Sequence, residues 1–297
     1  MQKSENHGGE YRITGHTKLV CLLGSPVAHS LSPLIHNDSF RELGLDYAYL
    51  CFDVDEEHLP AAVEGLKCMG VRGFNLTMPD KNRIVGLVDE LSPAADLIGA
   101  CNTVVNDNGR LTGHNTDGVG FIRALADYGF HVPGKNITIM GAGGAASAIT
   151  AQAALDGARS IRVFARPSSR FHERTVRLVE RINQMTKCRA TLCDQNDSGA
   201  LRGAVAESDL LVNATPVGMA PDTERSLIED PSYFHSGLFV ADAIYEPRET
   251  KLLRLAREAG CGTANGLYML LYQGAEAFRL WTGREMPTDL IKSRYFL

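Results

Sequence analysis

Strand-like runs alternate with amphipathic segments along most of the chain. Residues 19–23, 47–52 and 72–76 have the length and composition of buried strands, and residues 56–69 have apolar positions at helical spacing. This alternation is typical of βαβ units, in which strands lie parallel and helices cover the sheet. The pattern therefore predicts an α/β fold with a mostly parallel sheet in the first half of the chain.

The loop after the first predicted strand is the first candidate for a ligand site. It runs from Gly24 to Pro33 and carries two hydroxyls, on Ser30 and Ser32. Ligands of open α/β sheets bind beyond the carboxyl ends of strands, which favours a binding role for both serines. Alternatively, Ser32 is the N-cap of a helix that begins at Pro33. The two interpretations are compatible.

The strand at 72–76 runs into a segment that ends in a lysine, Lys81. Pro79 favours a helix start, which places Lys81 in the first turn, where the helix dipole disfavours a cation. Such a lysine is either an ordinary surface residue or a general acid/base whose pKa is lowered towards neutrality.

Polar groups recur at the ends of the following strands. A helix is predicted at 92–100, capped by Ser92 and Pro93, and a hairpin turn at 106–109 leads back to Asp117. The strand-end polar residues of this half are Asn75, Thr77, Lys81, Asn102 and Asp117. A small ligand rich in hydroxyls needs such partners, because each unpaired buried polar group costs about 1–3 kcal/mol.

The second half contains a dinucleotide-binding pattern. A helix leaves Asp117 and ends near Gly129, and the strand at 136–140 is followed at once by residues 141–146, Gly-Ala-Gly-Gly-Ala-Ala, and by a small-residue helix. Glycines in this strand-turn-helix setting let the backbone approach a pyrophosphate at the helix N-terminus. The alternative is a glycine-rich turn in another kind of α/β protein.

The end of the next strand, at 160–164, favours NADP over NAD. NAD enzymes tend to have a carboxylate there for the ribose hydroxyls, whereas this chain has Arg166, Ser168 and Arg170 and no acidic residue before Glu173. A guanidinium grips a 2′-phosphate through two hydrogen bonds. The alternative is that these arginines merely lie on the surface of a helix at 170–187.

Three further strands are predicted at 189–193, 209–213 and 238–241, and the loop after the second contains Thr215. An apolar stripe at helical spacing from Leu267 to Trp281 predicts a final helix. Gln273 lies on the flank of that stripe, so spacing alone leaves open whether it faces solvent or a cleft.

The length, composition, net charge and cysteine count limit the class of protein. A length of 297 residues favours two domains, and 44% hydrophobic with 22% charged residues is ordinary for a globular enzyme. The net charge of −5, with both signs scattered, favours neither nucleic acid nor an anionic membrane as partner. No apolar run is long enough for a membrane span. Seven cysteines without a C-x-x-C pair argue against a disulfide framework and a zinc site and favour reduced thiols in the cytoplasm.

Six separated motifs in the right order resemble the shikimate dehydrogenase family, including its quinate/shikimate branch. They are the loops at 30–33 and 75–81, Asn102-Thr103, the run 115–118, the glycine loop, and Gln273-Gly274-Ala275. The resemblance begins near Lys18 and extends to the C-terminus. Residues 1–16 lie before it and are expected to form a frayed tail.

The resemblance implies two domains with a cleft between them. An N-terminal α/β substrate domain with a mostly parallel sheet would comprise residues 17–117 and 266–297, because the C-terminal helix folds back onto it. A Rossmann-type, doubly wound NAD(P)-binding domain would comprise residues 118–265. The implied activity is the reversible, NADP-linked reduction of 3-dehydroshikimate to shikimate, a step towards aromatic amino acids, by a cytoplasmic monomer or homodimer.

The resemblance also implies a role for each site residue. Lys81 and Asp117 would be the catalytic pair, with Lys81 passing the proton. Ser30, Ser32 and Tyr245 would hold the substrate carboxylate. Asn75, Thr77, Asn102 and Gln273 would bind ring hydroxyls. The residues expected to bind the cofactor are Gly141, Ala142, Gly143, Gly144, Ala145, Ala146, Arg166, Ser168, Arg170, Thr215, Gly266 and Met269.

Departures from the family pattern keep alternatives open. Typical NADP-using members have Asn-Arg-Thr where this chain has Ala165-Arg166-Pro167, and the quinate/shikimate branch often has an acidic residue at Ser168. Tyr268 replaces a glycine and is expected to crowd the nicotinamide loop. The alternatives are a quinate/shikimate dehydrogenase that prefers quinate and uses NAD or both cofactors, and a dinucleotide-binding regulatory protein without activity.

Overall fold

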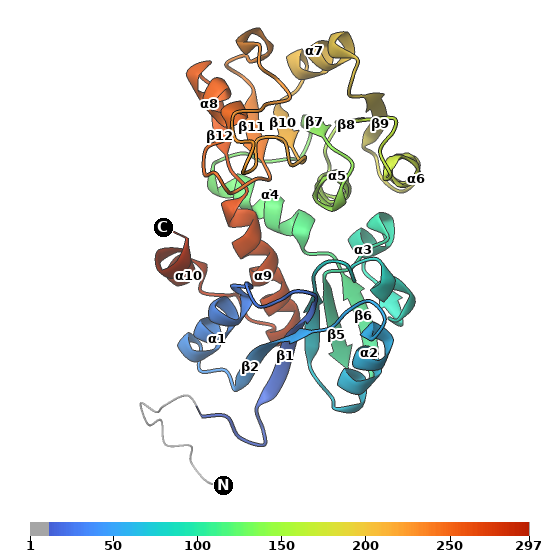
Figure 1. The fold of residues 1–297 in the computed structure, drawn as a ribbon, viewed down its shortest axis with the longest axis vertical. Coiled ribbons are helices and arrows are strands. Elements are labelled where there is room, and N and C mark those ends of the chain that lie inside the picture. The colour runs from blue at the N-terminus through green and yellow to red at the C-terminus, as the bar shows by residue number, and fades with distance from the viewer. Residues whose placement is uncertain (1–11, 297) are drawn as a thin grey trace.

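The structure, a computed structural model, describes residues 12–296 and contains two six-stranded sheets (Figure 1). The first has the order β2-β1-β3-β5-β6-β4. Its strands are β1 (Lys18–Gly24), β2 (Tyr47–Asp53), β3 (Gly73–Leu76), β4 (Glu90–Leu91), β5 (Thr103–Asp107) and β6 (Arg110–His114). β5 runs antiparallel to β3 and β6, and the other pairings are parallel. The sheet is mostly parallel, as predicted.

The second sheet has the order β12-β11-β10-β7-β8-β9, and all its pairings are parallel. Its strands are β7 (Asn136–Met140), β8 (Ser160–Ala165), β9 (Arg189–Asp194), β10 (Leu210–Asn213), β11 (Phe239–Asp242) and β12 (Gly262–Ala264). The chain starts in the middle at β7, moves outward to β9 and then crosses back to β10. This is the doubly wound Rossmann order, so the predicted fold class is confirmed.

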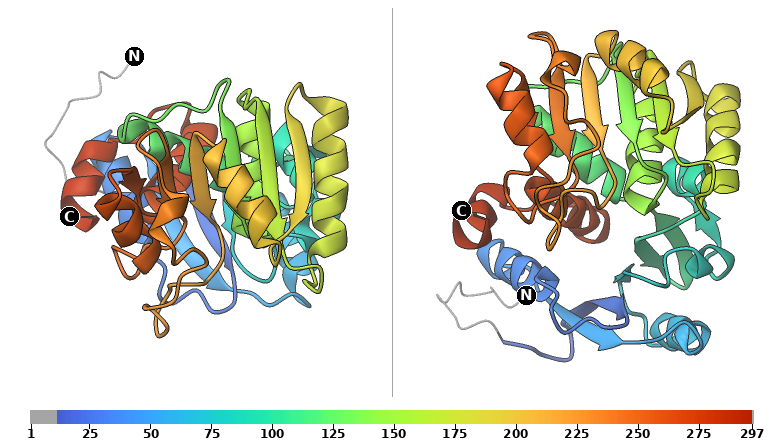
Figure 2. Two further views of the ribbon diagram at one scale, coloured as in Figure 1. Left: turned by 90° about the horizontal axis from the view of Figure 1, so that it is seen from above. Right: turned by 45° about the horizontal axis from the view of Figure 1, so that its top comes forward.

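Helices lie between the strands and cover the sheets. They are α1 (Ser32–Glu42), α2 (Leu59–Cys68), α3 (Pro93–Ile98), α4 (Asp117–Asp127), α5 (Gly144–Leu155), α6 (His172–Met185), α7 (Ser198–Ala206), α8 (Lys251–Glu258), α9 (Leu267–Thr282) and α10 (Thr288–Tyr295). Both faces of the second sheet are covered (Figure 2). Ile137 and Ile139 of β7 pack in one core with α5, whereas Met140 packs in another with α7 and α8, because alternate residues of a strand point to opposite faces.

The C-terminal helices return to the first sheet (Figure 1). Phe278 and Trp281 of α9 are buried in a core that includes Val20 and Tyr49 of the first sheet. The indole nitrogen of Trp281 donates to the carbonyl oxygen of Val104 in β5 at 3.0 Å. No helix within residues 12–296 is long and apolar enough to span a membrane.

Helix α4 connects the two halves, and two of its glycines permit very close packing. A Cβ atom at Gly120 would lie 2.5 Å from the backbone nitrogen of Gln273 in α9. A Cβ atom at Gly118 would lie 2.4 Å from the carbonyl oxygen of Ala148 in α5. Asp117 at the start of α4 is therefore held against one helix from each half.

Two local predictions are wrong. Residues 79–82 form turns, and the first helical turn, the 3₁₀ helix η1 (Arg83–Gly86), begins after Lys81. The backbone nitrogen of Asp80 donates to the carbonyl oxygen of Thr77 at 3.0 Å, so Pro79 is the third residue of a turn. Proline suits certain turns as well as the start of a helix, so Pro79 gave an ambiguous signal. Lys81 is consequently not in the first turn of a helix.

The second error concerns Ser32, which is not an N-cap. It is the first residue of α1, and the N-cap position is occupied by Leu31. The short elements β4, β12, α7, α8, α10, η1 and η2 (Pro231–Tyr233) were not predicted. Of the expected tail, residues 1–11 lie outside the described residues, and residues 12–16 contain no helix or strand.

Gly120→Ala is expected to lower the free energy of unfolding by about 1–3 kcal/mol, because the added methyl group forces α4 and α9 apart. Gly65→Ala in α2 is the matched control, since a Cβ atom there meets nothing within 4 Å. That control should be neutral or slightly stabilising. Urea unfolding of both variants measures the difference, and equal effects would contradict the close packing.

Candidate active site

A pocket of about 470 Å³ lies between the two halves. It is lined by the residues that the sequence analysis assigned to catalysis and substrate binding: Ser30, Ser32, Asn75, Thr77, Lys81, Asn102, Asp117, Tyr245 and Gln273. They come from the loops after β1, β3 and β11, from β3 itself, from the segment before β5, from the first residues of α1 and α4, and from α9. Strand ends from both sheets therefore converge on one cavity, and the individual roles stay predictions.

A second, larger depression of about 760 Å³ lies near the amino ends of β1 and β3. Its lining includes Lys18, Lys67 and Arg72. The guanidinium of Arg72 already donates to the carbonyl oxygens of Trp281 and Asn106, at 2.9 Å each. The smaller pocket is the better candidate site, because it brings convergent polar groups together with the glycine loop.

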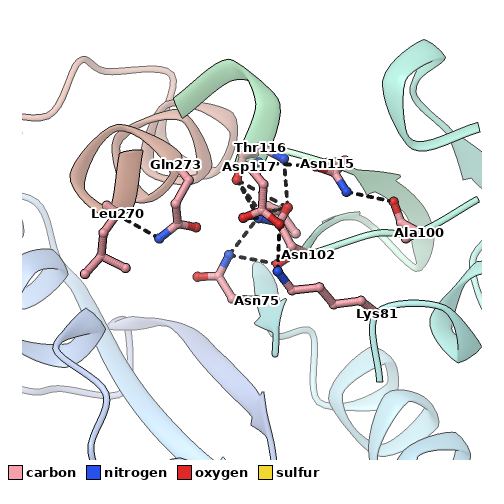
Figure 3. A network of polar contacts seen from close by, with 10 residues as sticks. Asn75, Lys81, Ala100, Asn102, Asn115, Thr116, Asp117, Leu270 and Gln273 are labelled. Carbon is pink, nitrogen blue, oxygen red and sulfur yellow. Dashed lines mark hydrogen bonds and ion pairs between the residues drawn. The ribbon is translucent and has the colours of Figure 1, made fainter. Parts of the chain in front are cut away.

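An ion pair lines the smaller pocket (Figure 3). The Nζ atom of Lys81 donates to Oδ2 of Asp117 at 2.6 Å. The side chains are 30% and 18% exposed, so both are partly shielded and both are accessible to a ligand. Asp117 lies in the first turn of α4, where the helix dipole favours a negative charge. The carbonyl oxygen of Lys81 accepts from the backbone of Cys101 at 2.8 Å, which anchors its turn.

Asn102 holds the carboxylate of Asp117 through the oxygen that Lys81 does not contact. Its Nδ2 donates to Oδ1 of Asp117 and to the hydroxyl of Thr116, both at 2.9 Å. Its Oδ1 accepts from the backbone nitrogen of Thr116 at 2.8 Å. Because Asn102 is only 2% exposed and its amide group is committed on both sides, it fixes the position of Asp117.

Two further amides border the pair. Oδ1 of Asn115 accepts from the backbone nitrogen of Asp117 at 3.2 Å, and its Nδ2 donates to the carbonyl oxygen of Ala100 at 3.1 Å. Gln273 donates to the carbonyl oxygen of Leu270 at 3.0 Å and lines the pocket. Gln273, on the flank of the apolar stripe of α9, therefore faces the cleft.

An ammonium beside a carboxylate can donate a proton to a ligand oxygen or take one from it. General acid–base catalysis requires such a group within hydrogen-bond reach of the reacting atom. The surrounding amides and hydroxyls can bind the other oxygens of a polyol. The pocket is thus suited to oxidation or reduction at one carbon of a hydroxylated ring.

Ser30 and Ser32, which follow β1, also line the pocket. The hydroxyl oxygen of Ser30 accepts from the backbone nitrogen of Ser32 at 3.2 Å, which shapes the turn before α1. Tyr245, in the loop after β11, is 48% exposed and lines the same cavity. These hydroxyls are available to an anionic or polar ligand group.

The glycine loop takes the predicted strand-turn-helix form. Gly141 has φ +124°, and a Cβ atom there would lie 2.6 Å from the carbonyl oxygen of Ala214, so only glycine fits. Gly143 is the N-cap of α5, and a Cβ atom at Gly143 or Gly144 would meet nothing within 4 Å. Open space in front of a helix N-terminus is what a pyrophosphate requires.

The residues predicted to bind the 2′-phosphate of NADP follow the end of β8. Arg166, Ser168 and Arg170 are exposed, and neither arginine has an ion-pair partner in the described part of the chain. Arg170 lies over the ring of Phe171, at 4.7 Å from its centroid. Both arginines precede α6, so they belong to the loop after β8 and not to that helix, and their binding of a 2′-phosphate stays a prediction.

The remaining predicted cofactor residues follow β10 and β12. The hydroxyl of Thr215 donates to Oδ1 of Asn213 at 2.7 Å. A Cβ atom at Gly266 would lie 2.1 Å from the carbonyl oxygen of Ala243, which excludes any larger residue. Gly266 and Met269 line the pocket.

Tyr268 does not crowd the nicotinamide loop, so that expectation is wrong. Its ring stacks on Tyr128, with centroids 6.1 Å apart, and Nζ of Lys292 lies 4.8 Å from its centroid. The residue is absent from the lining of the pocket, because its helix turns it towards α4 and α10. The side chain of Tyr268 therefore does not enter the pocket.

A buried carboxylate that the sequence analysis missed organises two of the site loops. Asp242, at the end of β11, accepts from the hydroxyl of Thr250 at 2.8 Å, from the backbone of Ile244 at 2.9 Å and from Nδ2 of Asn213 at 3.1 Å. Asn213 in turn holds Thr215. Burial outweighs these bonds and raises the pKa of Asp242 to about 6. A lone strand-end aspartate carried no sequence signal for this role.

Comparison with known proteins shows similarity over nearly the whole chain. The family model described as shikimate dehydrogenase substrate binding domain matches residues 22–104, and the model of the shikimate 5′-dehydrogenase C-terminal domain matches residues 266–294. Shikimate dehydrogenase (NADP(+)) of Listeria innocua is 50% identical over 96% of this chain and 98% of its own. The Streptococcus pyogenes protein of that name is 51% identical over 95% of this chain and 97% of its own.

A solved structure is also closely similar. Shikimate 5-dehydrogenase from Listeria monocytogenes, in complex with shikimate and NAD, superposes with a TM-score of 0.93 at 50% identity. The match covers 96% of this chain and 98% of that one. Both the fold and the arrangement of the two halves are therefore shared with that protein.

The free energy of unfolding should depend on the charge of Asp242. Since its folded pKa, about 6, lies above the ordinary 3.8, the native state binds the proton more tightly, and its contribution to stability is lost as the pH rises through 6. Compared with Asp242→Asn, the wild type should lose roughly 1 kcal/mol between pH 5 and pH 8. Urea unfolding of both forms tests this, and a pH-independent difference would contradict it.

Proposed function

The chain belongs to the shikimate dehydrogenase family, and from this premise we propose that it catalyses the reversible, NADP-linked reduction of 3-dehydroshikimate to shikimate. The observation that carries the proposal is the Lys81–Asp117 pair at 2.6 Å, in a pocket that Ala145 of the glycine loop also lines. The names of the 50% identical relatives support both substrate and cofactor.

NADPH, when bound, supplies the hydride that reduces the ketone carbon. Lys81 holds a proton at Nζ and delivers it to the ketone oxygen, so the carbonyl becomes a hydroxyl. Asp117 accepts from the same ammonium, keeps it directed into the pocket and offers Oδ1 or Oδ2 to a neighbouring substrate hydroxyl. In the reverse direction Lys81 removes the hydroxyl proton.

The remaining pocket residues bind and orient the substrate. Ser30, Ser32 and Tyr245 all line the cavity, and their three hydroxyls would donate to the carboxylate. Asn75, Thr77 and Gln273 also line the cavity and would accommodate the ring hydroxyls, whereas Asn102, whose amide hydrogens are both engaged, would act mainly by fixing Asp117 beside them. Binding the ring at both ends would hold its ketone carbon beside Lys81.

NADP fits the cofactor side of the cleft. Residues 141–146 provide the turn and the helix N-terminus that would hold the pyrophosphate, Thr215 lies next to Gly141, and Gly266 and Met269 line the pocket where the nicotinamide would lie. Arg166, Ser168 and Arg170 are exposed and available for the 2′-phosphate. NAD use is kept as a second possibility, because the solved Listeria monocytogenes protein is described in complex with NAD.

We assign residues 17–117 and 266–297 to the substrate domain and 118–265 to the dinucleotide domain. This division follows the two sheets and the return of α9 to the first one. A cytoplasmic location, and the choice between monomer and homodimer, stay predictions.

Oxidation of shikimate and quinate with NAD and with NADP, followed at 340 nm, tests the function directly. Shikimate with NADP should be the fastest of the four combinations. A preference for quinate would assign the chain to the other branch, and tight dinucleotide binding without any turnover would make it a regulatory protein.

Lys81→Ala should lower kcat for shikimate oxidation at least about a hundredfold, because the acid/base group is lost. Binding of NADP, measured by fluorescence titration, should stay within a factor of about two. Lys135→Ala is the control: Lys135 pairs with Asp209 at 3.2 Å, outside the pocket. Normal turnover of Lys81→Ala would exclude the proposed catalytic role.

A further inference from the structure

Tyr49 lies behind the pocket wall and contacts one of its polar residues. It is on β2, is fully buried and does not line the cavity itself. Its phenol donates to Oδ1 of Asn75 at 2.8 Å. Asn75 lines the pocket, and so does Ser32, whose hydroxyl also interacts with the phenol of Tyr49, so Tyr49 reaches the site through two intermediate side chains.

The orientation of the Asn75 amide is determined by its other contacts. Its Nδ2 donates to the carbonyl oxygen of Asn102 at 3.1 Å and to the hydroxyl of Thr103 at 2.9 Å. A backbone carbonyl only accepts, so the nitrogen must face Asn102 and the oxygen must face Tyr49. In Figure 3 this oxygen points away from Asn102.

These contacts limit what Asn75 can offer a ligand. Both amide hydrogens are engaged within the protein, and one lone pair of Oδ1 accepts from Tyr49. The group that remains is the second lone pair of Oδ1. A ligand atom at this position must therefore donate a hydrogen bond, as a hydroxyl does and as a ketone, an ether oxygen or a fluorine does not.

The phenol of Tyr49 is itself held rigidly. Its ring stacks on His36 with centroids 4.5 Å apart and an angle of 3°. Complete burial lowers the pKa of His36 to about 3, so the imidazole is neutral at neutral pH. The backbone of Tyr49 makes two bonds with the side chain of Asn37, at 2.8 and 3.0 Å. Neither the ring nor the strand can shift freely.

We propose that Tyr49 is a positioning residue that holds Asn75 as a hydrogen-bond acceptor for a non-reacting ring hydroxyl of the substrate. The inference rests on the proposed function and adds one criterion for the substrate class. The substrate must carry a hydrogen-bond donor at the ring position that faces Asn75. Removing the Tyr49 hydroxyl leaves Oδ1 without its donor from the protein, and the amide can turn away from the ligand.

Tyr49→Phe tests the proposal, because it keeps the ring and its stacking. The KM for shikimate should rise about fivefold, the typical effect of one hydrogen bond. The KM for NADP and kcat should change less than about twofold. Tyr47→Phe is the matched control: Tyr47 lies two residues earlier on the same strand and is buried, but its hydroxyl donates to the carbonyl oxygen of Trp281 at 3.3 Å.

Two additional measurements separate positioning from a general structural effect. In an Asn75→Ala background, Tyr49→Phe should raise KM no further, because residues that act through one contact are not additive. Shikimate analogues with fluorine in place of each non-reacting hydroxyl in turn give a readout without the Asn75 variant. For one of these analogues, kcat/KM should be about tenfold lower than for shikimate, both with the wild type and with Tyr47→Phe. With Tyr49→Phe the same analogue should show a clearly smaller loss relative to shikimate.

An unchanged KM in Tyr49→Phe, or the same fluorine penalty in all three proteins, would overturn the role of Tyr49. A wild type that oxidises no shikimate would instead overturn the proposed function on which the inference rests. The two failures are thus distinguishable in one set of assays.

Discussion

The ion pair between Lys81 and Asp117 is the contact on which the rest of the site depends. Its two members come from different elements, the turn after β3 and the start of α4. A separation of 2.6 Å requires both elements to be fixed, and each is tied by backbone and amide bonds to the segment around Asn102. The pair is therefore the result of a network and not of two free side chains.

Helix α4 gives this pair its place between the two halves. Asp117 is at one end, and the glycines along the helix bring it into contact with α5 on one side and α9 on the other. Because α9 carries Gln273 and α5 begins at the glycine loop, packing of one connecting helix relates the substrate pocket to the cofactor loop. The packing of α4 against α5 and α9 would thus set the position of the substrate hydroxyl relative to the hydride of the cofactor.

Buried polar groups outside the pocket support this arrangement at two places. Asp242 joins the loops after β10 and β11, and Tyr49 holds Asn75 from within the core of the first sheet. A buried polar group without a partner costs more than a typical hydrogen bond contributes, so such networks constrain the loops strongly.

Much of the fold and site could be predicted from the sequence because the signals were local. The glycine loop, the hairpin at 106–109 and the polar strand ends each depend on neighbouring residues, and strand ends in an α/β fold meet at one edge. The turn at Pro79 could not be predicted, since proline suits a turn and a helix start equally. In the sequence, Tyr49 is indistinguishable from any other apolar residue of a buried strand. The packing of Tyr268 away from the pocket depends on Tyr128 and Lys292, which are distant in the sequence.

The turnover of Asp117→Asn with shikimate and NADP tests the central claim most directly. This substitution removes the charge that holds Lys81 and keeps the size of the side chain. We expect kcat to fall at least about a hundredfold while the midpoint of urea unfolding and the affinity for NADP stay unchanged. Wild-type turnover would show that the pair is not catalytic, and loss of the folded state would show that Asp117 is instead a structural hinge.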